Sequence, residues 1–254
     1  MKMASGDGMA RRASRLCIAS VVLLGCGVQL APIATLERGM DVDRGASSTN
    51  GPRIVFLHGY ASSPEVFLGL TARPDLPRGT RLVLPRGMTA ARHTPGGFAW
   101  WPLPSDRRRI VRERFPGMDL ARGRVTELLH RVAREAPSQP IILGGFSQGA
   151  MVSLDVALHD QTPLAGLVLM SGTVIDETET LARLSSRRGL RVYMSHGVRD
   201  EVLPYDDDAR LSAAMREGGL DVSFTSFDGG HVVTPQVSTE VAAFVRRCAS
   251  TAER

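Results

Sequence analysis

Short continuous runs of apolar residues alternate along this chain with longer stretches in which apolar residues recur at helical spacing. The continuous runs have the length of buried strands. They cover residues 53–57, 81–84, 141–144, 164–170 and 190–195, and the more polar residues 222–227 form a sixth predicted strand. The stretches with helical spacing follow them, at residues 64–70, 119–135, 151–158, 178–187, 205–218 and 235–248. This alternation predicts an α/β fold, with a mostly parallel sheet of about six or seven strands and helices on both faces.

The beginning of the chain has the pattern of an export signal. Three arginines between residues 11 and 15 precede an apolar run over residues 16–25, which is shorter than the ~20 residues that a membrane-spanning helix needs. The run ends in Leu-Leu-Gly-Cys at Cys26, which resembles a bacterial lipobox. Residues 1–28 therefore predict an exported protein that is periplasmic, lipid-anchored through Cys26 or secreted. An over-long start on a cytoplasmic protein is the alternative.

Two further segments follow the predicted signal. Residues 29–52 lack sustained periodicity and end in a run rich in Gly, Ser and Pro, which indicates a linker. Residues 53–254 carry all of the predicted strands and helices, and we expect them to form one catalytic or binding domain. Between the strands at 164–170 and 190–195 there are too few residues for a large cap domain, so any site at that end of the sheet should be open.

Composition excludes several classes of partner. The 31 basic residues face 26 acidic ones, and neither a basic helix nor a stripe of interleaved aromatic residues is present, so we expect no nucleic-acid binding. The three cysteines are too few and too scattered for a disulfide framework or a metal site. Neither a metal nor another cofactor is implied, and the sequence does not fix the oligomeric state.

The clearest chemical motif lies at residues 145–149, Gly-Phe-Ser-Gln-Gly, between a predicted strand and a predicted helix. A G-x-S-x-G motif in this context places its serine on a strained turn, and the two glycines remove the Cβ atoms that would otherwise collide. The hydroxyl of Ser147 is then exposed at the carboxyl end of the strand, beside the N-terminus of a helix. Ser147 is therefore the candidate nucleophile.

An acid and a base follow at later strand ends. Asp200 comes after the strand at 190–195 and His231 after the last strand, which gives the order Ser, Asp, His found in α/β-hydrolases. The carboxyl ends of parallel strands meet at one edge of a sheet, so the three residues should lie together. Other acids compete for the role of Asp200, but residues 206–208 suit the first turn of a helix better. No metal is needed for such a triad.

Two loops are candidates for the surroundings of Ser147. The turn after the first strand of the domain could direct the N–H of Tyr60 at the serine hydroxyl, and His58 beside it is expected to be structural, as is His196. Trp100 and Trp101 lie in the longest irregular stretch, residues 85–117. They could wall an apolar substrate pocket or cover the edge of the sheet, and both alternatives stay open.

Five short motifs together resemble the phospholipase/carboxylesterase family of α/β-hydrolases, which includes the acyl-protein thioesterases. They are L-H-G-Y at 57–60, W-W-P-L at 100–103, G-F-S-Q-G at 145–149, H-G-V-R-D at 196–200 and G-H at 230–231. The resemblance spans about residues 53–247. It implies that Ser147, Asp200 and His231 form a catalytic triad and that the backbone N–H groups of Tyr60 and Gln148 form the oxyanion hole.

This resemblance predicts a serine carboxylesterase that acts on a small ester, with thioesters and lysophospholipids as further substrate classes. The Trp101-Pro102 pair departs from the family, which usually has another aromatic residue and an aspartate there, so acyl-chain preference does not transfer. Alternatives are an exported esterase acting on acylated polysaccharide, a peptidase of similar fold, or a non-catalytic binding protein on the same fold.

Overall fold

The computed structural model describes residues 39–43, 50–71, 73, 75–91, 94–104, 109 and 113–251. The predicted export signal over residues 1–28, with Cys26, lies outside the described residues. So does most of the predicted linker.

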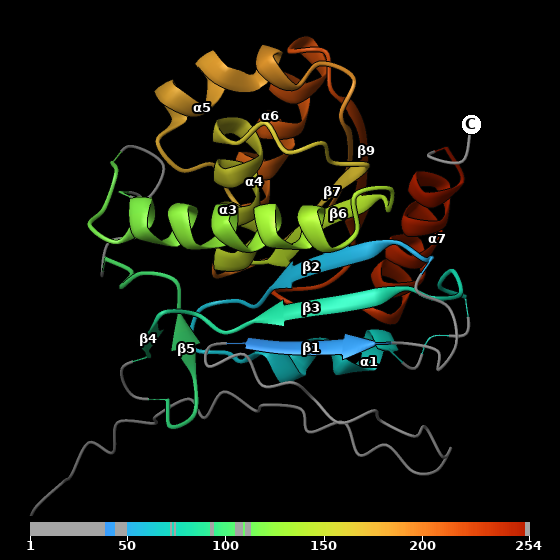
Figure 1. Ribbon diagram of the computed structural model, residues 1–254. Coiled ribbons are helices and arrows are strands. Elements are labelled where there is room, and N and C mark those ends of the chain that lie inside the picture. The colour runs from blue at the N-terminus through green and yellow to red at the C-terminus, as the bar shows by residue number, and fades with distance from the viewer. Residues whose placement is uncertain are drawn as a thin grey trace, which may run out of the picture.

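A seven-stranded sheet forms the centre of the described structure, in the order β1-β3-β2-β6-β7-β8-β9 (Figure 1). Its strands are β1 (Gly39–Asp43), β2 (Arg53–Leu57), β3 (Arg81–Pro85), β6 (Ile141–Phe146), β7 (Gly166–Met170), β8 (Arg191–Gly197) and β9 (Asp221–Phe227). The six strands from β3 to β9 are parallel, and β1 pairs with β3 in the antiparallel direction. The predicted fold class, a mostly parallel sheet of about six or seven strands, is confirmed.

Strand β1 corrects one detail of the sequence-based division, because it lies inside the predicted linker over residues 29–52. Its register runs from Gly39 opposite Pro85 to Asp43 opposite Arg81. An edge strand pairs on one side only and needs no continuous apolar run. The sequence Gly-Met-Asp-Val-Asp is too short for its alternation to stand out, so the sheet begins earlier than the pattern predicts.

Helices cover both faces of the sheet, as predicted. They are η1 (Pro64–Phe67), α1 (Leu68–Thr71), α3 (Met118–Glu135), α4 (Gln148–His159), α5 (Glu177–Arg183), η2 (Leu184–Arg187), α6 (Tyr205–Glu217) and α7 (Pro235–Thr251). Figure 1 shows α3 in front of the sheet and α7 behind it. The segment between β7 and β8 contains only α5 and η2 among its regular elements.

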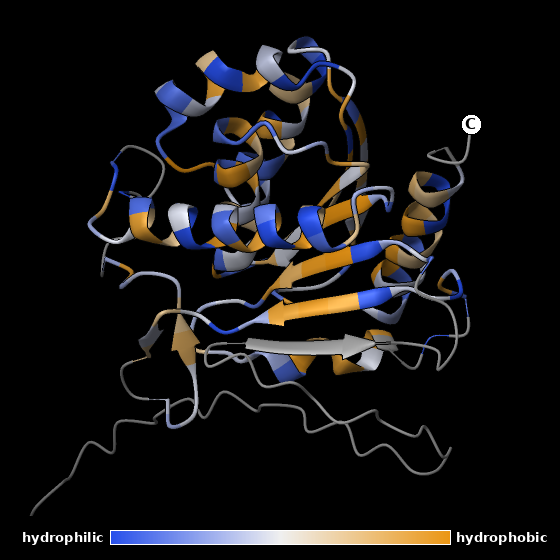
Figure 2. Ribbon diagram, in the orientation of Figure 1, coloured by the Kyte–Doolittle hydropathy of each residue, from blue (hydrophilic) through white to orange (hydrophobic). Residues whose placement is uncertain are grey.

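Successive residues of the central strands enter opposite cores. In β2, Val55 and Leu57 join the hydrophobic cluster beneath α3 and α4, whereas Ile54 and Phe56 join the cluster that α7 covers. All five residues of β2 are buried, and Figure 2 shows the central strands as mainly hydrophobic. Burying one such side chain contributes ~1.5–3 kcal/mol. This two-sided burial is the reason that the strands read as continuous apolar runs.

The stretch from 85 to 117 is not wholly irregular. Strands β4 (Thr89–Ala90) and β5 (Phe98–Ala99) pair in a small antiparallel sheet, and Ser62 bridges to Phe98. This bridge connects the second sheet to the loop that follows β2.

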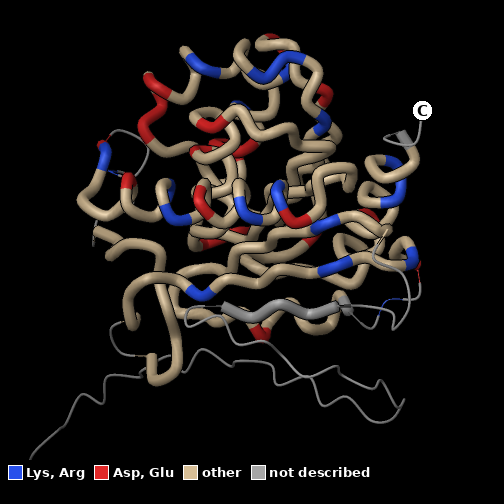
Figure 3. Tube along the Cα trace, in the orientation of Figure 1, with Lys and Arg blue, Asp and Glu red and all other residues tan. Residues whose placement is uncertain are grey.

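Figure 3 shows that the positions of basic and acidic residues are interspersed along the chain. This agrees with a diffuse rather than a concentrated basic charge. In the part of the chain that the structure describes, no helix is both long and apolar enough to cross a membrane.

Truncating a side chain in the middle of β7 should destabilise the whole domain. Leu167 is fully buried in the core beneath α4. We expect Leu167→Ala to lower the free energy of unfolding by about 2–5 kcal/mol, because the substitution leaves a cavity. Leu120→Ala is the matched control, since that side chain is 69% exposed. It should change the free energy by no more than about 0.5 kcal/mol. Urea denaturation measures both, and equal losses would contradict the packing described.

Candidate active site

Ser147 occupies a strained turn between β6 and α4. Its backbone angles are φ 56° and ψ −120°, a conformation that residues with a Cβ rarely adopt. A Cβ atom at Gly149 would lie 2.0 Å from the carbonyl oxygen of Leu57, so strand β2 and helix α4 can approach this closely only around glycine. The N–H of Ser147 donates to the carbonyl of Met170, 2.8 Å away on β7. The turn is thus fixed on both sides.

The three residues predicted for the triad form one hydrogen-bonded chain. The Nε2 atom of His231 lies 2.9 Å from Oγ of Ser147, and its Nδ1 atom lies 2.7 Å from Oδ2 of Asp200. Asp200 follows β8 and His231 follows β9, and the two loops are joined by a 2.9 Å hydrogen bond from the N–H of Arg199 to the carbonyl of Gly229. The parallel sheet therefore brings together residues that are up to 84 positions apart.

Asp200 is ionised and firmly held. Its Oδ1 atom accepts the backbone N–H groups of Val202 and Leu203 at 2.8 and 2.9 Å. Burial raises the pKa of Asp200, but hydrogen bonds from His196 and His231 outweigh it, and the pKa lies well below its usual value. An ionised carboxylate only accepts hydrogen bonds, so Nδ1 of His231 must donate to it. The lone pair of Nε2 is then left facing the hydroxyl of Ser147.

Two backbone N–H groups are available beside Ser147. Gln148 is the first residue of α4, and the first N–H groups of a helix have no acceptor within it. Tyr60 follows Gly59, where an added Cβ would lie 3.3 Å from Cβ of Ser147, so this turn passes directly against the serine. No acceptor for the N–H of Tyr60 is present among the described residues. Both groups can face an oxyanion formed next to Ser147.

The side chain of Gln148 has a second function that sequence reasoning missed. It is fully buried, and its Oε1 atom accepts the N–H of Trp100 at 3.0 Å while its Nε2 atom donates to the carbonyl of Trp101 at 2.8 Å. The amide thus holds the backbone of the tryptophan pair against the turn that carries Ser147. The only signal in the sequence was an amide side chain at a helix start, which is too common to be informative.

Of the two alternatives left open for Trp100 and Trp101, the structure favours burial over the wall of a substrate pocket. Trp100 has no exposed surface and Trp101 is 1% exposed, and both belong to the core beneath α3. The indole N–H of Trp100 donates to the carbonyl of His58 at 2.9 Å. Large apolar rings gain more by full burial than by lining an open cleft, and the Gln148 amide satisfies their backbone there.

The buried ring of His58 holds the turn before Tyr60 in place through two hydrogen bonds. Its Nδ1 atom lies 2.8 Å from the carbonyl of Gly59, and its Nε2 atom accepts the N–H of Gly87 at 2.9 Å. One nitrogen therefore donates and the other accepts, which is the arrangement of a neutral ring. Burial lowers the pKa of His58 in agreement with this. The expectation that His58 is structural is met.

His196 is also buried, but it touches the site. Its Nδ1 atom lies 2.7 Å from Oδ2 of Asp208, and its Nε2 atom lies 3.2 Å from Oδ2 of Asp200. The prediction placed Asp208 in the first turn of a helix, and it does lie in the first turn of α6. However, it is 1% exposed. Its spacing to Leu211 and Met215 was the signal that it faces inward.

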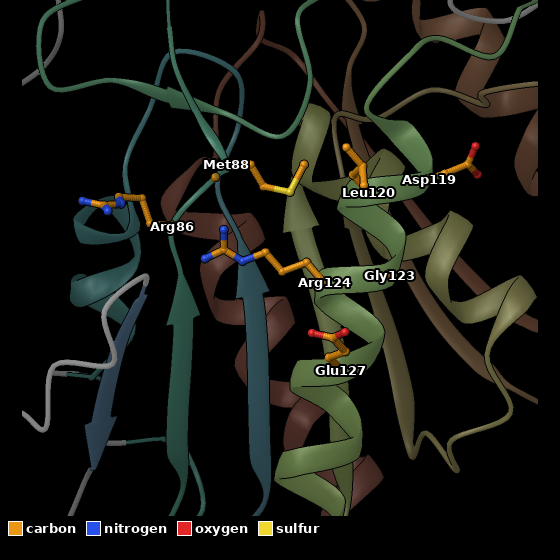
Figure 4. A pocket seen from close by; sticks show the side chains of 8 residues that line it. Arg86, Met88, Asp119, Leu120, Gly123, Arg124 and Glu127 are labelled. Carbon is orange, nitrogen blue, oxygen red and sulfur yellow. The ribbon is translucent and has the colours of Figure 1, made fainter.

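A pocket of about 550 Å³ lies between the loop after β3 and helix α3. Figure 4 shows its lining side chains, among them Arg86 and Met88 on the loop and Arg124 and Glu127 on the helix. None of the residues predicted for the site lines it. Among the described residues there is no cluster of three or more side chains that could hold a metal ion.

The chain is similar to known proteins over most of its length. The sequence profile of the family described as Phospholipase/Carboxylesterase matches residues 45–249. Acyl-protein thioesterase 1 of Gibberella zeae is 27% identical over 220 residues, which span 80% of this chain and 92% of that protein. Acyl-protein thioesterase 1 homolog 1 of Dictyostelium discoideum is 25% identical, over 79% of this chain and 92% of that protein.

Solved structures share the fold. The crystal structure of esterase PE8 covers 83% of this chain and 98% of its own, with a TM-score of 0.71 and 24% identity. Zea mays acyl-protein thioesterase 2 covers 83% of this chain and 99% of its own, with a TM-score of 0.63 and 23% identity.

Removing the amide of Gln148 should loosen the tryptophan pair. We expect Gln148→Ala to lower the free energy of unfolding by about 2 kcal/mol or more, because each buried polar group left unpaired costs about 1–3 kcal/mol. The fluorescence of the two tryptophans should shift to the red as water reaches them. Gln161→Ala, on the exposed surface, is the control. Unchanged stability and emission in Gln148→Ala would show that the amide does not hold this loop.

Proposed function

The chain belongs to the phospholipase/carboxylesterase family and is a serine hydrolase, and from this premise we propose that Ser147, His231 and Asp200 are its catalytic triad. The observation that carries the proposal is the hydrogen-bonded chain from Asp200 through His231 to a serine in a strained strand-to-helix turn. The proposed reaction is the hydrolysis of carboxylic esters through an acyl-enzyme.

In the first half of the reaction, His231 takes the proton of the Ser147 hydroxyl as its oxygen attacks the ester carbonyl. The carbonyl oxygen becomes an oxyanion, which the N–H groups of Tyr60 and Gln148 stabilise. Loss of one such donor typically costs ~10²–10³ in rate. Asp200 keeps Nδ1 of His231 protonated and stabilises the imidazolium that forms. Nε2 then returns its proton to the leaving alcohol, and the C–O bond breaks.

In the second half, water replaces the alcohol. His231 removes a proton from this water as it attacks the acyl carbon, the oxyanion forms again at the same two N–H groups, and collapse releases the acid and restores Ser147. No further group is needed in either half. The short segment between β7 and β8, with only α5 and η2 as regular elements, supports access for small or surface-exposed esters.

Assays with matched substrates can decide which kind of ester the protein hydrolyses. The relatives named acyl-protein thioesterases favour a thioester as the second candidate. Butyrylthiocholine and butyrylcholine differ only in sulfur or oxygen at the scissile bond, so the ratio of their kcat/KM values separates the two candidates. Acetylated xylan tests the polysaccharide alternative, and a lysophospholipid tests the lipid alternative.

Replacing the nucleophile should abolish turnover. With p-nitrophenyl acetate, butyrate and octanoate as substrates, we expect Ser147→Ala to lower kcat by at least about 10³-fold, because no other group forms the acyl-enzyme. The ranking of the three esters then measures the space for the acyl chain. Ser186→Ala is the control, since that hydroxyl bonds only to the backbone of Arg183 on the surface.

Equal rates for Ser147→Ala and the parent protein would overturn the proposal. No turnover of any ester by a folded parent protein would instead favour a binding protein that retains the fold.

We also propose that the protein is exported and that Cys26 carries a lipid. The arginines and the apolar run before the Leu-Leu-Gly-Cys sequence support this. Expressed at full length in a bacterium, the mature protein should begin at Cys26 with an added lipid mass and sediment with membranes. Cys26→Ser should remove the lipid, whereas Cys17→Ser should leave the mass of the mature protein unchanged, because Cys17 is removed with the signal. An unlipidated product that begins at Met1 would contradict the proposal.

A further inference from the structure

A second histidine lies behind the aspartate of the proposed triad. His196 belongs to β8 and has no exposed surface. Its Nε2 atom lies 3.2 Å from Oδ2 of Asp200, and this is the same oxygen that receives Nδ1 of His231 at 2.7 Å. Asp200 therefore lies between two imidazole rings. One ring faces Ser147, and the other has no contact with it.

The partners of His196 determine its charge. Nδ1 faces the carboxylate of Asp208 at 2.7 Å, and Nε2 faces the carbonyl of Leu203 at 3.1 Å as well as Asp200. All of these oxygens are acceptors. A neutral ring has an N–H on only one nitrogen, so its other lone pair would point at an oxygen. Only the imidazolium satisfies both sides.

Electrostatics agree with this geometry. Burial lowers the pKa of His196, but the hydrogen bonds that its ring donates to Asp200 and Asp208 raise the pKa more, to about 10. The other element packed on the ring is α6, whose Tyr205 meets it edge-on, with ring centroids 6.1 Å apart. The hydroxyl of Tyr205 forms a hydrogen bond with Ser226. Asp200, Asp208, Tyr205 and, beyond Asp200, His231 are the titratable groups that face this ring.

We propose that His196 is a positioning residue, a buried imidazolium that Asp208 keeps charged and that holds and moderates the carboxylate of Asp200. The proposal rests on the catalytic triad proposed above. With His196, Asp200 receives charge-assisted or backbone hydrogen bonds on both oxygens, from two loop N–H groups and two rings. A carboxylate held in this way cannot turn away from His231.

The imidazolium also acts on His231 through its charge. A carboxylate beside an imidazole favours protonation of that imidazole, and a protonated His231 cannot accept the proton of Ser147. The positive charge of His196 lies closer to Asp200 and His231 than the negative charge of Asp208 does. It therefore offsets part of the attraction that Asp200 exerts on a proton at His231. The positive charge of His196 therefore weakens the negative field of Asp200 at His231.

The test is a neutral replacement of the whole pair. In His196→Gln/Asp208→Asn, both side chains keep amide hydrogen-bonding groups but lose their charges. Because the lost positive charge was nearer to His231 than the lost negative one, His231 should be easier to protonate. The acid limb of the kcat/KM profile with p-nitrophenyl butyrate should move to higher pH by about 0.5–1 unit. We expect kcat to fall about tenfold, with KM unchanged, as Asp200 loses a charged donor.

A substitution at a neighbouring residue is the control for the loss of a negative charge from this turn of α6. Asp207→Asn removes a carboxylate from the same turn of α6, where it pairs with Arg210 rather than with His196. It should leave the acid limb and kcat unchanged. An acid limb that stays in place in the double variant, or moves equally in Asp207→Asn, would overturn the proposal.

A second measurement determines the charge of His196 in the parent protein itself. In ¹⁵N-labelled parent protein at pH 8, both ring nitrogens of His196 should carry protons and have the chemical shifts of an imidazolium, with assignment from the spectrum of Asp208→Asn. A neutral His196 at pH 8 would overturn the proposal even if the double variant failed to fold. These outcomes are distinct from failure of the triad, which Ser147→Ala tests by loss of turnover.

Discussion

The conformation of the backbone at Ser147 is the constraint on which the rest of the site depends. A non-glycine residue in this region of φ and ψ costs of order 1–3 kcal/mol, and the surrounding structure has to hold it there. Here the strain is maintained by the hydrogen bond from Ser147 to β7 and by the close approach of β2 to α4 around Gly149. The same approach places the loop with Tyr60 next to the serine. One tight contact between a strand and a helix therefore positions both the hydroxyl and its surrounding N–H groups.

The parallel sheet brings the remaining residues of the site together, and no single loop has to be long for this. Each strand from β6 to β9 ends at the same edge, so the first residues after each strand meet there whatever lies between them. The hydrogen bonds that join the loops after β8 and β9 remove the freedom that such short loops would otherwise keep. This is why Ser147, His231 and Asp200, which are far apart in the sequence, are joined by hydrogen bonds of 2.9 and 2.7 Å.

Residues at strand ends could be predicted from the sequence for the same reason. Strands β2, β3, β6, β7 and β8 are buried on both faces, so their apolar runs stand out, and Ser147 and Asp200 each follow one of them. His231 follows the edge strand β9, which is largely half-buried or exposed. Strand β1 could not be found in this way, since a five-residue edge strand leaves no continuous run. The burial of Trp100 and Trp101 depends on the amide of Gln148, almost fifty positions later, and no local pattern encodes such a partnership. The burial of Asp208 could have been predicted, because Asp208 lies at helical spacing from the apolar residues Leu211 and Met215 of α6.

Two buried histidines in this fold differ in charge because their hydrogen-bond partners differ. His58 meets one carbonyl and one N–H, so a neutral ring satisfies both nitrogens, and burial then favours the neutral form. His196 meets oxygen atoms on both sides, and two of its partners are carboxylates, so the same cost of burial is outweighed. Burial alone thus says little about the protonation of a histidine. The neutral ring of His58 supports the turn with Tyr60, where its two hydrogen-bond partners suit an uncharged imidazole. The charged ring of His196 lies behind Asp200, where its positive charge is balanced by a carboxylate.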